Sequence, residues 1–295
     1  MKEITLTNRD LKVVILPYGG IIKELWYKGT NVVLGKKNAH EYLDNPWHMG
    51  VCIGCYAGRL TSEYTIDQDR YTHIKKPAIQ LHGGKHGWDK AVWKIYDLYH
   101  GIGPHVVLEH ECLEQDCGHP GDVSVLLQYS LRENTLLIEY KAKTTKPTPI
   151  NITNHSYFNL SDAPNLGDHE LMIQSDEVLE LDSNLVPTGR INKVKKTDFD
   201  RNKSRPIGTS RYDDCFVLRE KETSSMRLKA NSTKIQMDLI KDQPGLVVFN
   251  PKELNGICFE AQKFSNAPNL PHFPNTIVRP YKRYTQKTQY VFSKF

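Results

Sequence analysis

The chain has 295 residues, of which 39% are apolar and 25% charged, a composition typical of an ordinary water-soluble globular protein. The net charge is +5, from 39 basic and 34 acidic residues, and the basic clusters at 193–196 and 201–205 are short. This balance argues against a nucleic-acid-binding protein. The sequence contains no apolar run long enough to span a bilayer, so we expect no membrane partner.

The N-terminus and the cysteines indicate a cytoplasmic protein. Residues 1–7 alternate like a strand and carry no signal-peptide core. Six cysteines then fit free thiols, since disulfides are rare in the cytosol. Cys52 and Cys55 form a C-x-x-C motif, but Cys112 and Cys117 are spaced too widely to supply a second one, so we expect no bound metal.

Short β-rich segments separated by turn residues dominate the chain, and long helical periodicity is nearly absent. The segments 124–131 and 135–143, joined by a short polar turn, predict a β-hairpin. Further strands are expected at 11–16, 106–109, 234–239 and 246–249. Many short strands with regular turns predict an all-β sandwich or barrel, and residues 1–295 show no linker that would divide them into two domains.

Two segments combine chemistry-bearing residues with strand-like surroundings. Residues 151–160 place His155 among Asn, Thr, Ser and Tyr, and residues 256–262 place the lone carboxylate of Glu260 in an apolar strand. A buried charge is costly unless it is paired or functional. His155 and Glu260, each expected on a strand, are the minimal parts of an acid–base pair. A structural ion pair and a satisfied core histidine would give the same pattern.

Three further motifs offer ligand contacts, each with a simpler structural explanation. Glycines precede Arg59, which fits either a ligand contact or a tight turn with an exposed arginine. The loop 81–90 carries His82, His86 and Trp88, whose polar tips and flat ring suit a sugar, although loop histidines are commonly solvated. Asp213 enters a strand beside a tyrosine, as it would in an ordinary turn.

Together these motifs resemble the aldose 1-epimerase, or galactose mutarotase, family over nearly the whole chain. The most specific matches are Asn154-His155-Ser156-Tyr157-Phe158-Asn159-Leu160, Leu81-His82-Gly83-Gly84 and Phe259-Glu260-Ala261-Gln262. The resemblance implies a β-supersandwich with short helices only in connections, and no organic cofactor. It also implies interconversion of the α and β anomers of free aldohexoses, with a small sugar as the partner and a monomer or homodimer as the assembly.

The resemblance also assigns roles to residues. It implies that His155 is the general acid, that Glu260 is the general base, and that Arg59, His82 and Asp213 bind the sugar. Gly58 and Val247 depart from the family pattern, because many members have Asn and Gln there. Since both departures remove groups that would read hydroxyls, they predict relaxed sugar preference.

Two alternatives remain open at this point. A sugar-binding or regulatory module could retain the fold without turnover, although binding alone does not need His155 and Glu260. An epimerase for a phosphorylated or other hexose could use the same fold, and an additional Arg or Lys at the pocket mouth would favour it.

Overall fold

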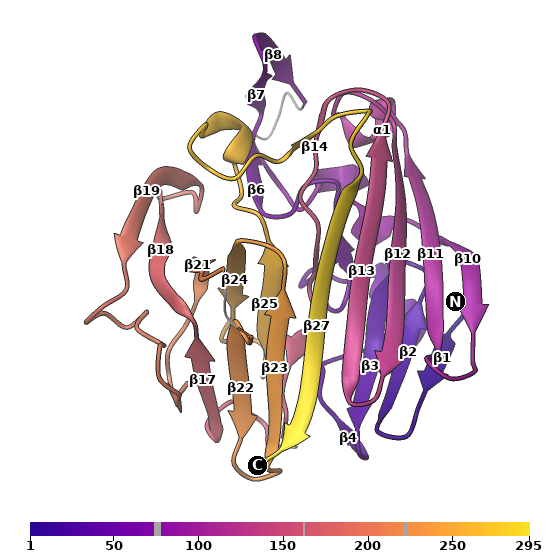
Figure 1. Ribbon diagram of the computed structural model, residues 1–295, viewed down its shortest axis with the longest axis vertical. Coiled ribbons are helices and arrows are strands. Elements are labelled where there is room, and N and C mark those ends of the chain that lie inside the picture. The colour runs from indigo at the N-terminus through magenta and orange to yellow at the C-terminus, as the bar shows by residue number, and fades with distance from the viewer. Residues whose placement is uncertain (74–77, 162, 221–222) are drawn as a thin grey trace.

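The computed structural model describes residues 1–73, 78–161, 163–220 and 223–295. The secondary structure of the described chain is mostly β-strand, as predicted, and the strands assemble into two large sheets and several small ones (Figure 1). No helix among the described residues is long and apolar enough to cross a membrane.

The larger sheet has nine strands, and all its pairings are antiparallel. Its order is β10 (Lys94–Tyr99), β11 (His105–Cys112), β12 (Val123–Arg132), β13 (Thr135–Thr144), β27 (Tyr284–Lys294), β23 (Ile235–Lys241), β22 (Met226–Ala230), β17 (His169–Ile173) and β20 (Arg205–Pro206). The C-terminal strand β27 therefore lies in the middle of the sheet, between strands far from it in sequence (Figure 1).

The second large sheet has six strands and carries much of the site described below. Its order is β16 (Tyr157–Phe158), β25 (Ile257–Gln262), β24 (Gly245–Phe249), β21 (Asp213–Leu218), β18 (Ser175–Leu181) and β19 (Pro187–Lys193). The two large sheets meet through aromatic side chains. The ring of Phe158 lies 4.8 Å from that of Tyr290 on β27, and the Tyr290 hydroxyl donates to the Phe259 carbonyl.

Smaller sheets and single turns of helix complete the fold. The N-terminal sheet has the order β1 (Ile4–Thr7), β2 (Leu11–Leu16), β3 (Ile21–Tyr27) and β4 (Thr30–Asn31). The two-stranded pairs are β5 (Cys52–Ile53) with β15 (Thr153–Asn154), β6 (Arg59–Thr61) with β9 (Ile79–Leu81), β7 (Glu63–Ile66) with β8 (Asp69–Thr72), and β14 (Thr148–Pro149) with β26 (Ile277–Val278). The helices are η1 (Ala39–Leu43), η2 (Gly84–His86), η3 (Trp88–Lys90), α1 (Glu114–Cys117) and η4 (Ala267–Asn269).

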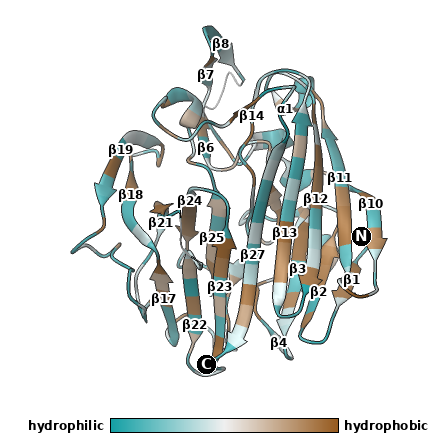
Figure 2. Ribbon diagram, in the orientation of Figure 1, coloured by the Kyte–Doolittle hydropathy of each residue, from teal (hydrophilic) through white to brown (hydrophobic). Residues whose placement is uncertain are grey.

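The alternation of apolar and polar residues that predicts the strands also explains how they pack. In β12, Val123, Val125 and Leu127 are buried while Ser124 is exposed, which is the period-two pattern of a sheet with one face on a core. The alternating colours along the strands in Figure 2 show the same pattern. The predicted strands at 11–16, 106–109, 234–239 and 246–249 and the hairpin between 124–131 and 135–143 are confirmed.

The prediction of six free thiols is wrong for two of them. Cys112 ends β11, and the turn of α1 brings Cys117 back to it, so their Cα atoms lie 6.0 Å apart and the two sulfurs form a disulfide. Cys52, Cys55, Cys215 and Cys258 are buried free thiols. The sequence did not reveal this pair, because its formation depends on the turn that α1 makes between Cys112 and Cys117.

Candidate active site

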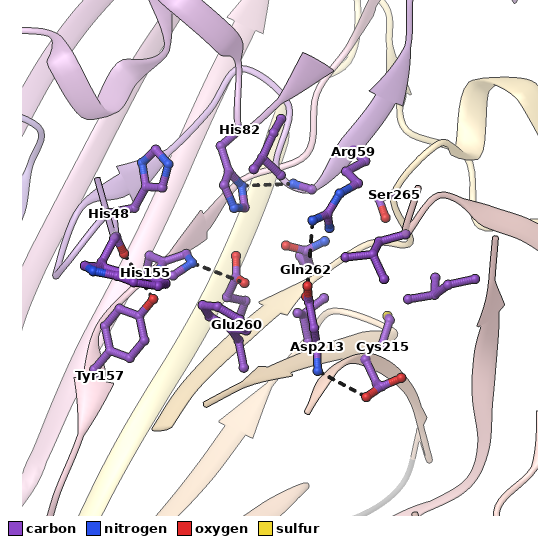
Figure 3. Close-up of a pocket in the computed structure, with 18 of the residues that line it drawn as sticks. His48, Arg59, His82, His155, Tyr157, Asp213, Cys215, Glu260, Gln262 and Ser265 are labelled. Atoms are coloured by element: carbon purple, nitrogen blue, oxygen red, sulfur yellow. Dashed lines mark hydrogen bonds and ion pairs between the residues drawn. The ribbon is translucent and has the colours of Figure 1, made fainter. Parts of the chain in front are cut away.

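A cavity of about 800 Å³, measured to its open mouth, lies over the six-stranded sheet. The structure brings all five site residues predicted from the sequence into its lining: Arg59, His82, His155, Asp213 and Glu260 (Figure 3). They come from five segments that are separated by up to about two hundred residues, which is the span from Arg59 to Glu260. Only the sheet topology places them around one volume.

Glu260 is held by strand β25, which is buried on both faces. Alternation along the strand sends Phe259 into the main hydrophobic core and Glu260 and Gln262 into the cavity. On the neighbouring strand β24, Val247 pairs with Glu260 and also lines the cavity. The carboxylate is therefore fixed by its sheet position, as predicted.

His155 is not on a strand, which corrects the prediction. It lies in the break between β15 and β16, where its N–H donates to the Val51 carbonyl and its carbonyl accepts from the Gly50 N–H. The Asn154 side chain holds the same break by donating to the Gly50 carbonyl and accepting from the Ser156 hydroxyl. The polar residues of this motif thus fix the backbone that presents the imidazole, while Nδ1 of His155 has no partner among the described residues.

His155 and Glu260 form a buried pair at the floor of the cavity. The distance from His155 Nε2 to Glu260 Oε1 is 3.6 Å, and each side chain is only 3% exposed. Burial lowers the pKa of His155 to about 3, and the nearby His48 ring lowers it further. Burial also raises the pKa of Glu260 to about 8; the Asp213 carboxylate adds to this rise and Arg59 opposes it. In the empty cavity at neutral pH the pair therefore carries one proton and no net charge.

A second charged pair lies beside the first. Nη2 of Arg59, the first residue of β6, is 3.7 Å from Oδ2 of Asp213, the first residue of β21. Burial raises the pKa of Asp213, and Arg59 works against that rise. This is a half-exposed pair whose donors and acceptors face the cavity, an arrangement suited to holding hydroxyl groups.

His82 offers a hydrogen-bond donor to the cavity. The Gly58 N–H donates to its Nδ1 over 3.2 Å, and a backbone N–H can only donate, so Nδ1 must be the unprotonated nitrogen. Burial holds the pKa of His82 well below its usual range, so the neutral ring carries its proton on Nε2. His82, His155 and Glu260 have potential ligand atoms within 4.8 Å of one another, but a protonated Nε2 fits a sugar oxygen better than a metal ion.

The rest of the His82 loop differs from the prediction. His86 is exposed, and Trp88 is buried in the main core, where its ring lies 5.8 Å from that of Trp93. The flat surface of the cavity comes instead from Trp47 and Phe249, whose ring centroids are 6.4 Å apart. Trp47 sits outside the motifs that drew attention in the sequence, and nothing in its local pattern marks it as a pocket residue.

The sequence analysis also gave no role to several polar residues of the lining, among them His48, Asp214, Gln262 and Ser265. Gln262 leaves its Oε1 buried without a partner among the described atoms, so an amide is available although Val247 is apolar. Ser265 fills the space beside Gly58, where a Cβ would lie 2.6 Å from the serine Cβ at a φ of +77°. A side chain at position 58 would therefore collide with Ser265, whose hydroxyl lies in the space that an Asn side chain would need.

Comparisons with known proteins identify the family and agree with the fold. Residues 2–291 match the family model described as aldose 1-epimerase. The chain is 31% identical to galactose mutarotase from Sus scrofa over 99% of its length and 94% of the relative's. It is 28% identical to aldose 1-epimerase from Escherichia coli K12, covering 88% of this chain and 84% of that one. Its fold superposes on the crystal structure of a GalM/aldose epimerase homologue from C. elegans with a TM-score of 0.93, at 26% identity and 99% coverage of both chains.

A mostly β fold with a cavity that holds buried His155 and Glu260 beside Arg59 and Asp213, matched over nearly the whole chain by one family model, defines the class of protein. The chain belongs to the aldose 1-epimerase family.

Proposed function

We propose that this protein interconverts the α and β anomers of free aldohexoses. The single observation that carries the proposal is the buried His155–Glu260 pair, which faces the cavity with an unpartnered carboxylate oxygen on Glu260. Anomer exchange removes a proton from the C1 hydroxyl and adds one to the ring oxygen. A pair that holds one proton between two groups can supply both transfers.

In the proposed reaction Glu260 is the base and His155 the acid. Hydroxyls that donate to the Glu260 carboxylate stabilise its charged form, so sugar binding moves the shared proton towards His155. Glu260 then takes the proton of the C1 hydroxyl, the bond from C1 to the ring oxygen breaks, and its electron pair on the ring oxygen takes the proton of His155. The C1–C2 bond of the resulting aldehyde rotates, and the reverse transfers close the ring on the other face.

The charges around the cavity favour a neutral sugar over a phosphorylated one. Among the described lining residues, Arg59 is the cation that faces the cavity, and it is already paired with Asp213. Asp213, Asp214 and Glu260 contribute three carboxyl groups. A phosphate would meet this acidic lining without a free cation to neutralise it, so the epimerase for a phosphorylated hexose is the weaker alternative.

Polarimetry of freshly dissolved α-glucose and α-galactose tests the proposal. We expect the protein to accelerate the approach to the equilibrium rotation in proportion to its concentration, and Glu260→Gln to remove most of that acceleration. If sugars bind, as judged by calorimetric titration, but the rotation changes at the buffer rate, the chain is a sugar-binding module without turnover.

A further inference from the structure

His48 lines the cavity next to His82, and the proposed reaction gives it no role. Its side chain is 23% exposed. The ring centroids of His48 and His82 lie 5.1 Å apart at an interplanar angle of 69°, and the centroid of His155 is 5.9 Å from that of His48 (Figure 3). Three imidazoles therefore converge on one side of the cavity, opposite the Arg59–Asp213 pair.

The hydrogen-bond partner of His48 gives it the opposite tautomer to that of His82. Nδ1 of His48 lies 3.1 Å from Oδ2 of Asp89, whose side chain is 5% exposed. A carboxylate can only accept, so Nδ1 of His48 carries the proton. Nζ of Lys90 forms an ion pair with the same oxygen at 3.4 Å. In the neutral ring, Nε2 of His48 is then a hydrogen-bond acceptor.

The two neighbouring rings thus present a donor and an acceptor. His82 receives the Gly58 N–H on Nδ1 and donates from Nε2, whereas His48 donates from Nδ1 to Asp89 and accepts on Nε2. A hydroxyl oxygen is the one neutral group that accepts and donates at a single atom. The two rings are close neighbours, with centroids 5.1 Å apart, and both line the cavity.

Backbone conformation supports a dedicated role for both rings. His48 and His82 have φ values of +52° and +53°, in the left-handed region that residues other than glycine rarely adopt. They are the two histidines with positive φ among the residues that the structure describes, and both line the cavity. This conformation costs backbone energy in a residue other than glycine, and at both positions the side chain lines the cavity.

We propose that His48 is a specificity-determining residue that holds one sugar hydroxyl jointly with His82. That hydroxyl accepts from Nε2 of His82 and donates to Nε2 of His48, while Asp89 sets the tautomer of His48. This inference rests on the proposed function for the kind of ligand, a neutral aldose, but concerns binding and not turnover.

The test compares sugars that lack one donor at a time. Dissociation constants are measured for wild type, His48→Asn and His48→Gln with galactose, glucose and their monodeoxy and monodeoxyfluoro analogues at C2, C3, C4 and C6. Asparagine tolerates positive φ but its amide is too short to replace Nε2, whereas glutamine has an amide long enough to reach the same position. Fluorine accepts weakly and cannot donate, so it removes the bond to His48 specifically.

At one ring position we expect fluorine to weaken binding to wild type by about tenfold and binding to His48→Asn by less than about twofold. His48→Gln should recover part of the wild-type penalty at that same position, and the penalties at the other positions should be unchanged in both variants. Equal penalties for wild type and His48→Asn at every position would overturn the proposal and leave the His48–Asp89 contact as a link between two loops. A wild-type protein that binds none of the sugars would overturn it as well.

Nitrogen-15 NMR of the wild-type histidines gives a second reading that does not depend on a folded variant. We expect an Nδ1–H tautomer for His48, an Nε2–H tautomer for His82, and shifts of both Nε2 signals when galactose is added. A His48 ring that is unaffected by saturating sugar contradicts the proposal. Both measurements report sugar binding, so the role of His48 is tested separately from anomer exchange. Polarimetry at the buffer rate would refute the proposed reaction, but the dissociation constants would still decide the role of His48.

Discussion

Two groups of histidines in this molecule each contain buried rings, but they differ in their partners and in their access to a cavity. The first is the pocket histidine group, His48, His82 and His155, which surrounds the cavity with Glu260. The second is the closed histidine group, His73 and His119, whose rings stack with centroids 4.9 Å apart. Burial is the main cause of the lowered pKa of His82 and His155 in the first group and of His73 and His119 in the second. The pKa falls to about 3 for His155 and His119 and to about 4 for His73.

The groups differ in their partners. In the closed histidine group the partner of His119 is a phenol, since Nδ1 of His119 lies 2.9 Å from the hydroxyl of Tyr64. In the pocket histidine group the partner of His155 is a carboxyl group with a raised pKa, and both face an open cavity. A lowered histidine pKa therefore does not identify a catalytic residue here. The proposed catalytic role of His155 rests instead on a second group that shares the proton, together with room for a substrate.

Glu260→Gln should produce the largest difference between the two groups. The substitution keeps the shape of the side chain and removes the base, so we expect anomer exchange to slow by ~10²-fold or more. Stability should respond in the opposite direction. A carboxyl whose pKa is raised by folding loses stability as pH rises from its unfolded value through about 8, and glutamine has no such loss.

The measurements are polarimetry and thermal unfolding at two pH values, one below and one above that pKa. The variant should unfold at the wild-type temperature or higher, with the greater advantage at the alkaline pH. A folded Glu260→Gln protein with wild-type exchange rates would refute the assigned base.

His82→Ala should have the next largest effect, because it removes a donor without touching the proton-sharing pair. We expect kcat/KM to fall by roughly tenfold to a hundredfold, the range for one or two hydrogen bonds lost to a ligand. Arg59→Ala is the matched variant from the other side of the cavity, and its loss should be similar. Steady-state kinetics with a circular dichroism check of folding is the measurement, and wild-type kinetics in either variant would remove that residue from the site.

The pH dependence of exchange should report the pocket pair and not the closed histidine group. The active form holds one proton across His155 and Glu260, so activity should be level through neutral pH and decline above about 8 as the last proton leaves. The decline should approach about tenfold per pH unit. A profile that instead falls on the acid side of neutrality, with its midpoint near the ordinary histidine pKa, would show that the shared-proton state is not the active one.

His119→Phe should show the converse behaviour, with unchanged kcat/KM and lower stability. The ring that replaces His119 cannot accept from the Tyr64 hydroxyl, and an unsatisfied buried hydroxyl costs about 1–3 kcal/mol. The loss should be greatest at neutral pH. A histidine with a lowered folded pKa already loses stability as pH falls below its unfolded value, so wild type and variant should converge in acid. Chemical denaturation at two pH values measures this, and a tenfold loss of activity would contradict the distinction between the groups.

The smallest expected effect concerns sugar preference. Val247 lines the cavity opposite Glu260 and can read no hydroxyl, so we expect glucose and galactose to have kcat/KM values within about tenfold of each other. Steady-state kinetics with the two sugars is the measurement, and a preference of a hundredfold or more for one of them would contradict this expectation.

The sequence by itself determined most of the strands and which residues line the cavity as candidate reacting groups. Alternation in segments such as 124–131 predicts strands because a strand with one face on a core must repeat every two residues. Glu260 stood out because a carboxylate in an apolar strand needs a reason to be there. The resemblance to a family, carried by short motifs around His155, His82 and Glu260, added their roles.

The tertiary structure decided what local pattern could not. His155 lies in a break between two strands because its backbone bonds to residues 50–51, a hundred positions away. Trp88, which was expected to offer a ring to a sugar, lies in the core, and Cys117 forms a disulfide with Cys112. Both outcomes depend on how the loops close, which local sequence does not show. His48 gained its tautomer from Asp89, and His82 from Gly58, through contacts between segments that the sequence does not place together. Which ring nitrogen of a histidine donates depends on its partner, and these partners come together only when the sheets have assembled.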